Sequence, residues 1–359
     1  MSGGVSADLA DQSGQQVWFQ ETALEKRGLK LDFGAPVTAA VAVGEAVAVG
    51  FGDGTVRFFR PGYDPVVAHA HRGAVLCLEA DATHVVTGGD DGRFLRISQE
   101  GAVDEIDSFG SRWVDCVVTG RGQLACSSGR IAYVWSEGES RARQLEHPST
   151  VGGLAFDAKG KRLAVAHYGG VTIWERGERR WKPSKLVWKG SHGAISFSPD
   201  GKFLVTAMQE NALHVWRLRD KKNMQMAGYP AKIKSFTWVG DTPYLATSGA
   251  DEAICWPFDG KDGPLGRTPV CIAHGGQQFA TLVQALRTET AVLVGFQDGA
   301  VLLGEVDETK EAVVLRGSTG AEVTALALTV SSSHVLIGDA KGSVLWTPFW
   351  AGDEDARHV

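Results

Sequence analysis

A short phrase recurs eight times along this chain of 359 residues: a hydrophobic run, a turn rich in Gly and Asp, and a second run that often ends in an aromatic residue. The turns centre on Asp53, Asp91, Gly129, Tyr168, Glu210, Asp251, Asp298 and Lys341, at gaps of 38, 38, 39, 42, 41, 47 and 43 residues. A period near forty residues is typical of repeat architectures, in which each unit packs only against its neighbours.

The fifth repeat shows the local structure most clearly. It divides into the strand AISF, the turn SPDG, the strand KFLVTAM, the turn QEN and the strand ALHVWRL. Ser198-Pro199-Asp200-Gly201 has turn chemistry, because Pro fixes φ, Asp bonds nearby backbone and Gly accepts positive φ. A fourth, outer strand follows each unit, most clearly at 65–70, 185–190 and 311–317. Four strands per forty residues predict the blades of a β-propeller.

We expect an all-β chain with a single closed propeller over 17–350, between a disordered tail at 1–16 and an acidic tail at 351–359. Eight four-stranded blades are predicted at roughly 37–70, 74–108, 113–146, 150–190, 194–228, 232–273, 279–317 and 322–350. The last blade lacks an outer strand, so we expect residues 28–33 to complete it and close the ring, which removes an exposed edge. Residues 16–27 are expected to add a strand or short helix. A seven-bladed ring with one unit as a decoration is the alternative.

These repeats resemble the WD-repeat family of β-propellers, which often holds each blade with a tetrad of His, Ser or Thr, Asp and Trp. The resemblance covers roughly residues 29–350 and implies tetrad positions His192, Thr206, Glu210 and Trp216 in the fifth repeat. It implies His71, Thr87 and Asp91 in the second repeat, where Ile97 replaces Trp, and His147 and Trp174 in the fourth. In the sixth repeat Thr247 and Asp251 fit, but Trp256 comes one residue early. The remaining repeats depart further, so packing is expected to hold those blades. The abundance of Ala, Val and Gly suggests a bacterial-type, divergent member.

Composition limits the class of protein. No run of eighteen apolar residues exists, and the N-terminus lacks the basic start and apolar core of a secretory signal. Five scattered cysteines without CxxC spacing favour reduced thiols and a cytoplasmic location.

The search for catalytic and metal motifs gives little. The sequence has no GxSxG elbow, no phosphate-binding GxxxxGK[ST] loop and no HExxH pair. His69 and His71 form an HxH pair, but His71 fits the tetrad better than a metal site. The GDGT, GDDG and QDG segments lack the staggered acidic ligands of a calcium loop and are better explained as tight turns. We therefore expect no enzyme activity, no metal and no cofactor.

Charge is strongly uneven. Residues 159–234 hold sixteen Lys or Arg and five Asp or Glu, a net charge of +11, although the whole chain has −6 and the remainder therefore −17. In the resembling family, the turn between the first two strands and the connection between the last two lie on one ring face. Twelve cations in such turns of units four and five should therefore gather on one sector of that face, with Trp181 among them; we call these twelve the basic sector. They are Lys159, Lys161, Arg162, Arg176, Arg179, Arg180, Lys182, Lys185, Lys202, Arg219, Lys221 and Lys222.

The opposite face offers a second candidate surface. Arg112 and Trp113 lie in a loop that enters unit three, and equivalent loops carry Tyr168, Met208, Gln209 and Gln277. Arg, Trp, Tyr and Met are enriched at interface hot spots, although they also serve as loop anchors.

The sequence thus favours a non-enzymatic cytosolic scaffold that presents ring-face loops to protein partners, acidic ones among them, and is monomeric on its own. The alternative is an adaptor for a nucleic acid or phosphorylated ligand that binds through the basic sector, since clustered cations attract both. The net negative charge and the scarcity of exposed aromatics favour the protein partner over nucleic acid.

Overall fold

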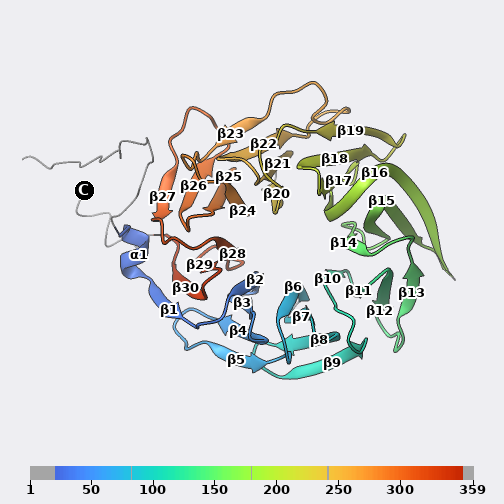
Figure 1. The fold of residues 1–359 in the computed structure, drawn as a ribbon, viewed down its shortest axis with the longest axis horizontal. Coiled ribbons are helices and arrows are strands. Elements are labelled where there is room, and N and C mark those ends of the chain that lie inside the picture. Colours follow the sequence, from blue (N-terminus) through green and yellow to red (C-terminus); the bar gives the residue numbers. More distant parts are fainter. Residues whose placement is uncertain (1–20, 82, 179, 241, 351–359) are drawn as a thin grey trace, which may run out of the picture.

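The structure, a computed structural model, describes residues 21–350 except 82, 179 and 241. These residues contain one short helix and thirty β-strands, and Figure 1 shows the strands arranged in sheets around a central axis. The fold is therefore an all-β propeller, as the repeat predicts. The two predicted tails, at 1–16 and 351–359, lie outside the described residues.

Six of the sheets have four antiparallel strands each. Three of them come from the first half of the chain: β2 (Val37–Val43), β3 (Ala46–Phe51), β4 (Thr55–Phe59) and β5 (Val66–His69); β6 (Val75–Asp81), β7 (His84–Gly89), β8 (Arg93–Ser98) and β9 (Val103–Ser108); and β10 (Cys116–Gly120), β11 (Gln123–Ser128), β12 (Ile131–Ser136) and β13 (Arg143–Glu146). The other three are β20 (Phe236–Val239), β21 (Tyr244–Thr247), β22 (Ala253–Pro257) and β23 (Val270–Ile272); β24 (Ala280–Ala285), β25 (Ala291–Phe296), β26 (Val301–Glu305) and β27 (Val313–Arg316); and β28 (Val323–Leu328), β29 (His334–Asp339) and β30 (Ser343–Pro348) with β1 (Leu29–Asp32).

The seventh sheet has six strands and combines the fourth and fifth units. It contains β14 (Val151–Phe156), β15 (Arg162–Arg176), β16 (Trp181–Phe197), β17 (Phe203–Met208), β18 (Ala212–Arg217) and β19 (Lys222–Met226). β15 doubles back at Gly169 and Gly170, whose φ angles are 91° and 135°, and the N–H of Arg176 donates to the Lys161 carbonyl at 2.8 Å. β16 pairs with β15 up to Ser191 and with β17 from His192 onward.

The described chain therefore forms seven sheets, and the prediction of eight separate four-stranded blades is wrong. Its error lies in units four and five, where the connections at 169–170 and 191–192 are so short that strand geometry continues through them. The two halves of this sheet nevertheless pack against each other, through Ile173 from one and Phe197 and Trp216 from the other.

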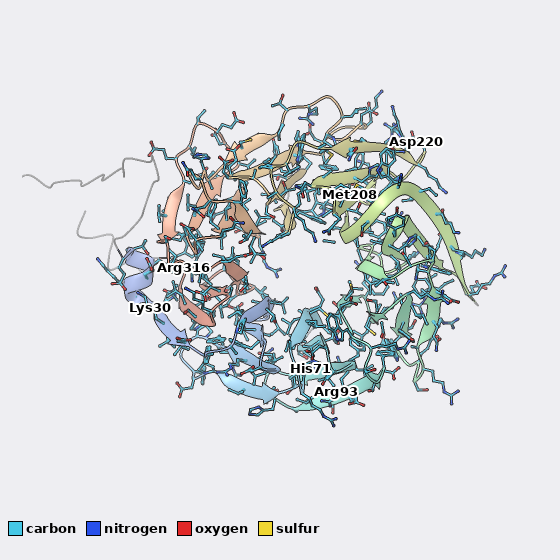
Figure 2. All side chains as sticks on the ribbon, viewed as in Figure 1. Lys30, His71, Arg93, Met208, Asp220 and Arg316 are labelled. Atoms are coloured by element: carbon cyan, nitrogen blue, oxygen red, sulfur yellow. The ribbon has the colours of Figure 1, made fainter. Side chains whose placement is uncertain are left out.

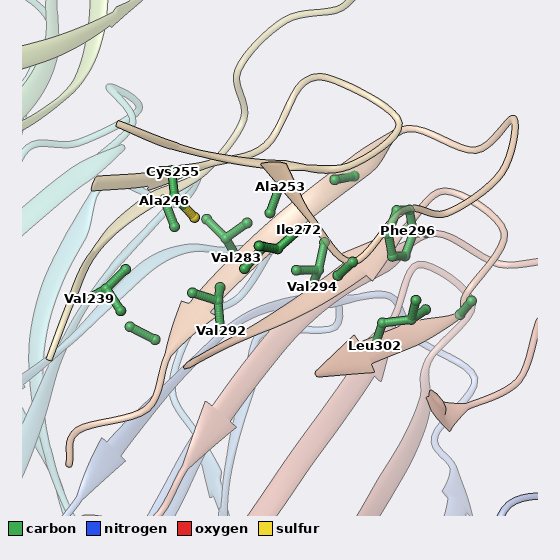
Figure 3. Packing of buried hydrophobic residues seen from close by; sticks show 14 residues of the cluster. Val239, Ala246, Ala253, Cys255, Ile272, Val283, Val292, Val294, Phe296 and Leu302 are labelled. Atoms are coloured by element: carbon green, nitrogen blue, oxygen red, sulfur yellow. The ribbon is translucent and has the colours of Figure 1, made fainter. Parts of the chain in front are cut away.

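The core is divided among the contacts between successive units. Seven clusters of buried hydrophobic residues each join strands from two consecutive units, and an eighth joins the first unit to the last. Figure 3 shows one of them, in which Val239 and Ile272 of unit six pack in one cluster with Val283, Val292 and Val294 of unit seven. Hydrophobic burial thus holds each unit to its neighbours, as expected of a repeat protein.

The N-terminal segment packs on the last sheet. Thr22 caps α1 (Ala23–Arg27) in a capping box with Glu25. The expected short helix is thus present within 16–27. β1 pairs antiparallel with β30, from Leu29 opposite Trp346 to Asp32 opposite Ser343, so the predicted partner of residues 28–33 is also present. Figure 1 shows this segment beside β27 and β30.

Candidate binding surfaces

Turns from units four, five and six meet in a groove of about 470 Å³. Its lining residues, which we call the basic groove, are Arg162, Gly201, Lys202, Arg217, Leu218, Arg219, Gly260 and Lys261. Arg162 begins β15, Gly201 and Lys202 lie in the turn before β17, and Arg219 follows β18. The N–H of Leu218 donates to the Lys202 carbonyl at 2.8 Å, which holds the two turns of unit five together. First-to-second turns and third-to-fourth connections thus share one side of the ring.

Unit six supplies the remaining wall through its long connection between β22 and β23. Arg217 is buried and donates to Asp220 through Nε and Nη2, at 3.0 and 2.6 Å, and to Asp262 through Nη1. Gly263, with φ 60°, lies so close to Phe203 that a Cβ would stand 2.9 Å from its ring. Arg217 and Gly263 therefore fix this connection against unit five.

The acidic residues near the groove contact its cations without lining it. Asp157 accepts from Arg162 Nε at 2.9 Å, and Asp200 pairs with Lys202 at 2.8 Å. Hydrogen bonds from Arg217 lower the pKa of Asp220 to about 2. No Asp or Glu is among the described residues that line the groove, whereas five Lys or Arg are. The lining is therefore cationic, although Asp157, Asp200, Asp220 and Asp262 lie within ion-pair distance of four of its five cations.

The guanidinium of Arg162 is held in place from two sides. Its Nε donates to Asp157, and its Cζ lies 4.9 Å from the centre of the Phe197 ring. Asp157 itself is buried; although burial opposes its ionisation, hydrogen bonds from Arg162 and nearby backbone N–H groups hold its pKa below the usual value. Arg162 Nη2 would lie 3.4 Å from a Cβ on Gly201, so one terminal amino group lies beside the turn that lines the groove.

The structure brings only part of the basic sector together. Arg162, Lys202 and Arg219 line the groove, and Lys221 Nζ donates to Ser184 in β16 at 2.9 Å. The other described cations of the sector are exposed on turns and strands and do not line the groove: Lys159, Lys161, Arg176, Arg180, Lys182, Lys185 and Lys222. Arg179 lies outside the described residues.

Trp181 requires a correction, because it does not stand exposed among these cations. Its side chain is 8% exposed and packs with Leu145 and Val165 between units three and four. A large apolar ring at the start of β16 gains more from burial than from exposure at the rim. Arg217 and Lys261 were not among the residues predicted to bind a partner. The 47-residue gap between the turns at Asp251 and Asp298 indicates extra residues in unit six, but nothing in the sequence indicates that they fold back on unit five.

On the predicted opposite face, most candidate side chains are exposed. Trp113 is 61% and Tyr168 57% exposed, and Arg112, Gln209 and Gln277 are exposed as well. Met208 is the exception: it is 2% exposed, so its proposed contact with a partner is wrong. Figure 2 shows Met208 toward the centre of the ring and Asp220 at its outer edge. A pocket of about 550 Å³ lies beside the loop that carries Gln277 and is lined in part by Glu252, Ala273 and His274.

The tetrad residues implied by the WD-repeat resemblance form hydrogen bonds in three units. His71 contacts Asp91 and Thr87, each at 2.9 Å, through its two ring nitrogens. His192 Nδ1 lies 2.8 Å from the Thr206 hydroxyl, and Trp174 Nε1 donates to His147 Nε2 at 2.9 Å. Ile97 is fully buried where the tetrad would have Trp. In unit five Trp216 contributes ring packing against His192, with centroids 5.4 Å apart.

Unit six contains a chain of side-chain hydrogen bonds that the sequence did not reveal. Trp256 Nε1 donates to the Tyr229 hydroxyl at 2.6 Å, and that hydroxyl lies 2.8 Å from Thr247 Oγ1. Tyr229 precedes the inner strand, where other units have His. Trp256 lies opposite Leu245 as Trp216 lies opposite Leu204 in unit five, so its early position in the sequence reflects a shorter turn and did not point to Tyr229.

Within the described ranges, no group of three or more His, Cys, Asp or Glu side chains is placed to hold a metal ion. No helix in this part of the chain is long and apolar enough to cross a membrane. All five cysteines are free thiols, and burial raises the pKa of Cys116 and Cys255 to about 12. Nothing in these residues points to catalysis.

The family model "WD domain, G-beta repeat" matches residues 187–217, which contain the end of β16, β17 and β18. Among solved structures, the C-terminal WD40 domain of Sif2 superimposes with a TM-score of 0.72 at 15% identity, over 90% of this chain and 98% of that one. The matched repeat, the sheets and the hydrogen-bonded His residues together support a WD-repeat β-propeller.

Two curated proteins resemble shorter segments. An LEC14B homolog of Prunus armeniaca is 25% identical over 100 residues, which are 28% of this chain and 19% of that protein. A ribosome biogenesis protein WDR12 homolog of Drosophila mojavensis is 25% identical over 96 residues, 23% of each chain. The chain thus spans about a fifth of these relatives. Both come from eukaryotes, so the expectation of a bacterial-type member is not supported.

Proposed function

We propose that this chain is a non-enzymatic cytosolic scaffold that binds an acidic segment of a partner protein in the basic groove. The observation that carries the proposal is a groove lined by five cations and no carboxylate, in a chain whose remainder is strongly acidic. The WD-repeat resemblance supports a role in protein interaction, and the free cysteines agree with a reducing compartment. The sheets hold the turns in place, so binding costs little backbone ordering.

The same groove is a poor match for a nucleic acid strand. Proteins that bind single strands without sequence preference stack the bases on aromatic side chains along a charged path. None of the residues lining the basic groove is aromatic. The predicted loops with Arg112 and Trp113 offer a second protein contact, which the experiment below includes.

The test is quantitative affinity purification from native cells. Arg219→Glu with Lys261→Glu should remove the principal co-purifying proteins, because both exposed cations line the groove. Lys232→Glu is the matched control, since Lys232 is exposed in unit six but does not line the groove. Trp113→Ala measures the opposite face. An unchanged set of partners in the double variant would contradict the proposal.

We also propose that the pairing of β1 with β30 closes the ring. Support comes from the buried cluster in which Val37 and Phe51 of the first sheet meet Leu336 and Val344 of the last. Closure leaves the last sheet with the outer strand that its own repeat lacks.

A further inference from the structure

We infer that the basic groove binds a phosphoryl group on a side chain of the partner protein. This inference rests on the proposed function and specifies the chemistry of the partner. Carboxylates and phosphates both attract cations, but they differ in charge and in the number of donors that they can accept from.

The cations differ in how far they are already neutralised. The Nε, Nη1 and Nη2 atoms of Arg217 all donate hydrogen bonds to the carboxylates of Asp220 and Asp262. Arg219 is half exposed. Its Nε lies 3.9 Å from the Asp220 carboxylate and its Nη2 lies 3.8 Å from that of Asp262, and both distances are too long for hydrogen bonds. Lys261 has no ion pair with any described residue. Arg219 and Lys261 thus retain most of their capacity for an incoming anion.

Arg162 adds geometry to this charge. Asp157 uses its Nε, and Phe197 supports the face of the guanidinium. Its terminal nitrogens Nη1 and Nη2 make no hydrogen bond within the described structure. A planar guanidinium held in this way presents two parallel donors, which match the oxygens of a phosphate.

The groove has the size and charge for such a group. A phosphoserine carries about −1.5 to −2 charges at neutral pH and three acceptor oxygens. A carboxylate brings one charge and two acceptor oxygens, whereas a phosphate brings more charge and three oxygens, enough to pair with more than one of the lining cations Arg162, Arg219 and Lys261. The volume of about 470 Å³ leaves room for the residue that carries the phosphate. Two turn glycines, Gly201 and Gly260, keep Cβ atoms out of the lining.

The experiment measures direct binding of the full chain to three degenerate peptide libraries by fluorescence anisotropy. The libraries have acidic flanks and a fixed central phosphoserine, serine or glutamate. We expect the phosphoserine library to bind roughly tenfold more tightly than the other two, in line with charge-assisted hydrogen bonds. Arg219→Ala with Lys261→Ala should remove this preference, and Lys232→Ala should leave it.

Arg162→Lys separates geometry from charge. It keeps the cation but loses the paired donors, so it should weaken phosphoserine binding more than glutamate binding and thereby reduce the preference for phosphoserine. Thermal unfolding of each variant shows whether it still folds; where Arg162→Lys is unstable, the Arg219 and Lys261 variants alone decide.

The outcomes separate this inference from the proposed function. Equal binding of all three libraries would overturn the phosphoryl site, while loss of that binding in the charge-reversed chain would preserve an acidic partner. A single-stranded RNA oligonucleotide that displaces the peptides and binds more tightly would overturn both. Phosphatase treatment of cell extract should remove the partners that charge reversal removes; partners that persist after phosphatase would also overturn the inference.

Discussion

In several units a buried polar side chain that precedes the inner strand forms hydrogen bonds with the strands that follow. The residue type differs between units, but the contact is of the same kind. His71, His147 and His192 each contact a hydroxyl, carboxylate or indole group, and Tyr229 does the same in unit six. A buried donor left without its acceptor costs more than the net value of the bond. Each of these residues is therefore more important than one hydrogen bond implies.

Tyr229→Phe tests this at the scale of one atom. The change removes the hydroxyl that accepts from Trp256, so that indole N–H loses its partner in a partly buried setting. We expect the free energy of unfolding to fall by about 1–3 kcal/mol, measured by urea denaturation. Tyr63→Phe is the control, because Tyr63 is 72% exposed and should change stability by less than about 0.5 kcal/mol. Equal effects of the two changes would contradict the role of Tyr229.

At the scale of elements, the six-stranded sheet depends on buried neutral histidines. Burial, with a contribution from His192, lowers the pKa of His214 to about 3; burial, with a contribution from His167, lowers that of His147 to about 4. His214 stacks on Trp188 with ring centroids 4.2 Å apart, and neither of its ring nitrogens has a hydrogen-bond partner among the described residues. Protonation would place an unpaired charge between β16 and β18.

The sign of the pH effect follows from these directions. In the unfolded chain these histidines have a pKa of about 6.5, so below that pH the unfolded chain binds protons that the folded chain does not bind. The free energy of unfolding should therefore fall as the pH drops from about 6.5 toward 4. Glu79 acts oppositely, since burial raises its pKa to about 7. Because the natural chain and the His214→Phe variant both contain Glu79, its contribution cancels in the difference between their free energies of unfolding.

This variant should lose less stability than the natural chain between pH 6.5 and 4, by an amount on the order of a few kcal/mol. Parallel pH profiles of the two chains, measured by urea denaturation, would contradict the role assigned to His214.

At the scale of the whole molecule, the helix α1 and strand β1 connect the chain's first described residues to its last sheet. Leu24 is 4% exposed and packs with Leu345 and Phe349, and Thr347 donates to the Leu24 carbonyl at 3.2 Å. Arg27 Nη2 donates to the Phe349 carbonyl at 2.9 Å. These contacts hold β1 against β30.

Leu24→Ala should therefore weaken the whole ring. We expect a loss of about 2–4 kcal/mol, typical of a buried Leu truncation, against a small effect of Leu29→Ala, where the side chain is 48% exposed. If the pairing closes the ring, hydrogen exchange should accelerate in both β2 and β28. Acceleration confined to α1 and β1 would argue against closure by this pair.

The sequence alone determined the all-β class, the repeat, the strands and the partner of residues 28–33. Those features depend on alternating burial and turn chemistry, which are local. The turn from Ser198 to Gly201 can be predicted because its Ser198 and Asp200 side chains accept hydrogen bonds from the next backbone N–H groups, those of Phe203 and Lys202. The excess of cations in 159–234 is also evident from the sequence, because net charge is a count of residues.

Only the tertiary structure decided which of those cations share a site. The basic groove depends on the connection of unit six returning to Arg217 and on Asp side chains contacting the cations from outside the lining. The fusion of units four and five into one sheet depends likewise on a strand that continues where a break was expected. Such contacts join residues far apart in the chain. Whether they form depends on the balance between packing and solvation over the whole molecule, which a local sequence pattern does not contain.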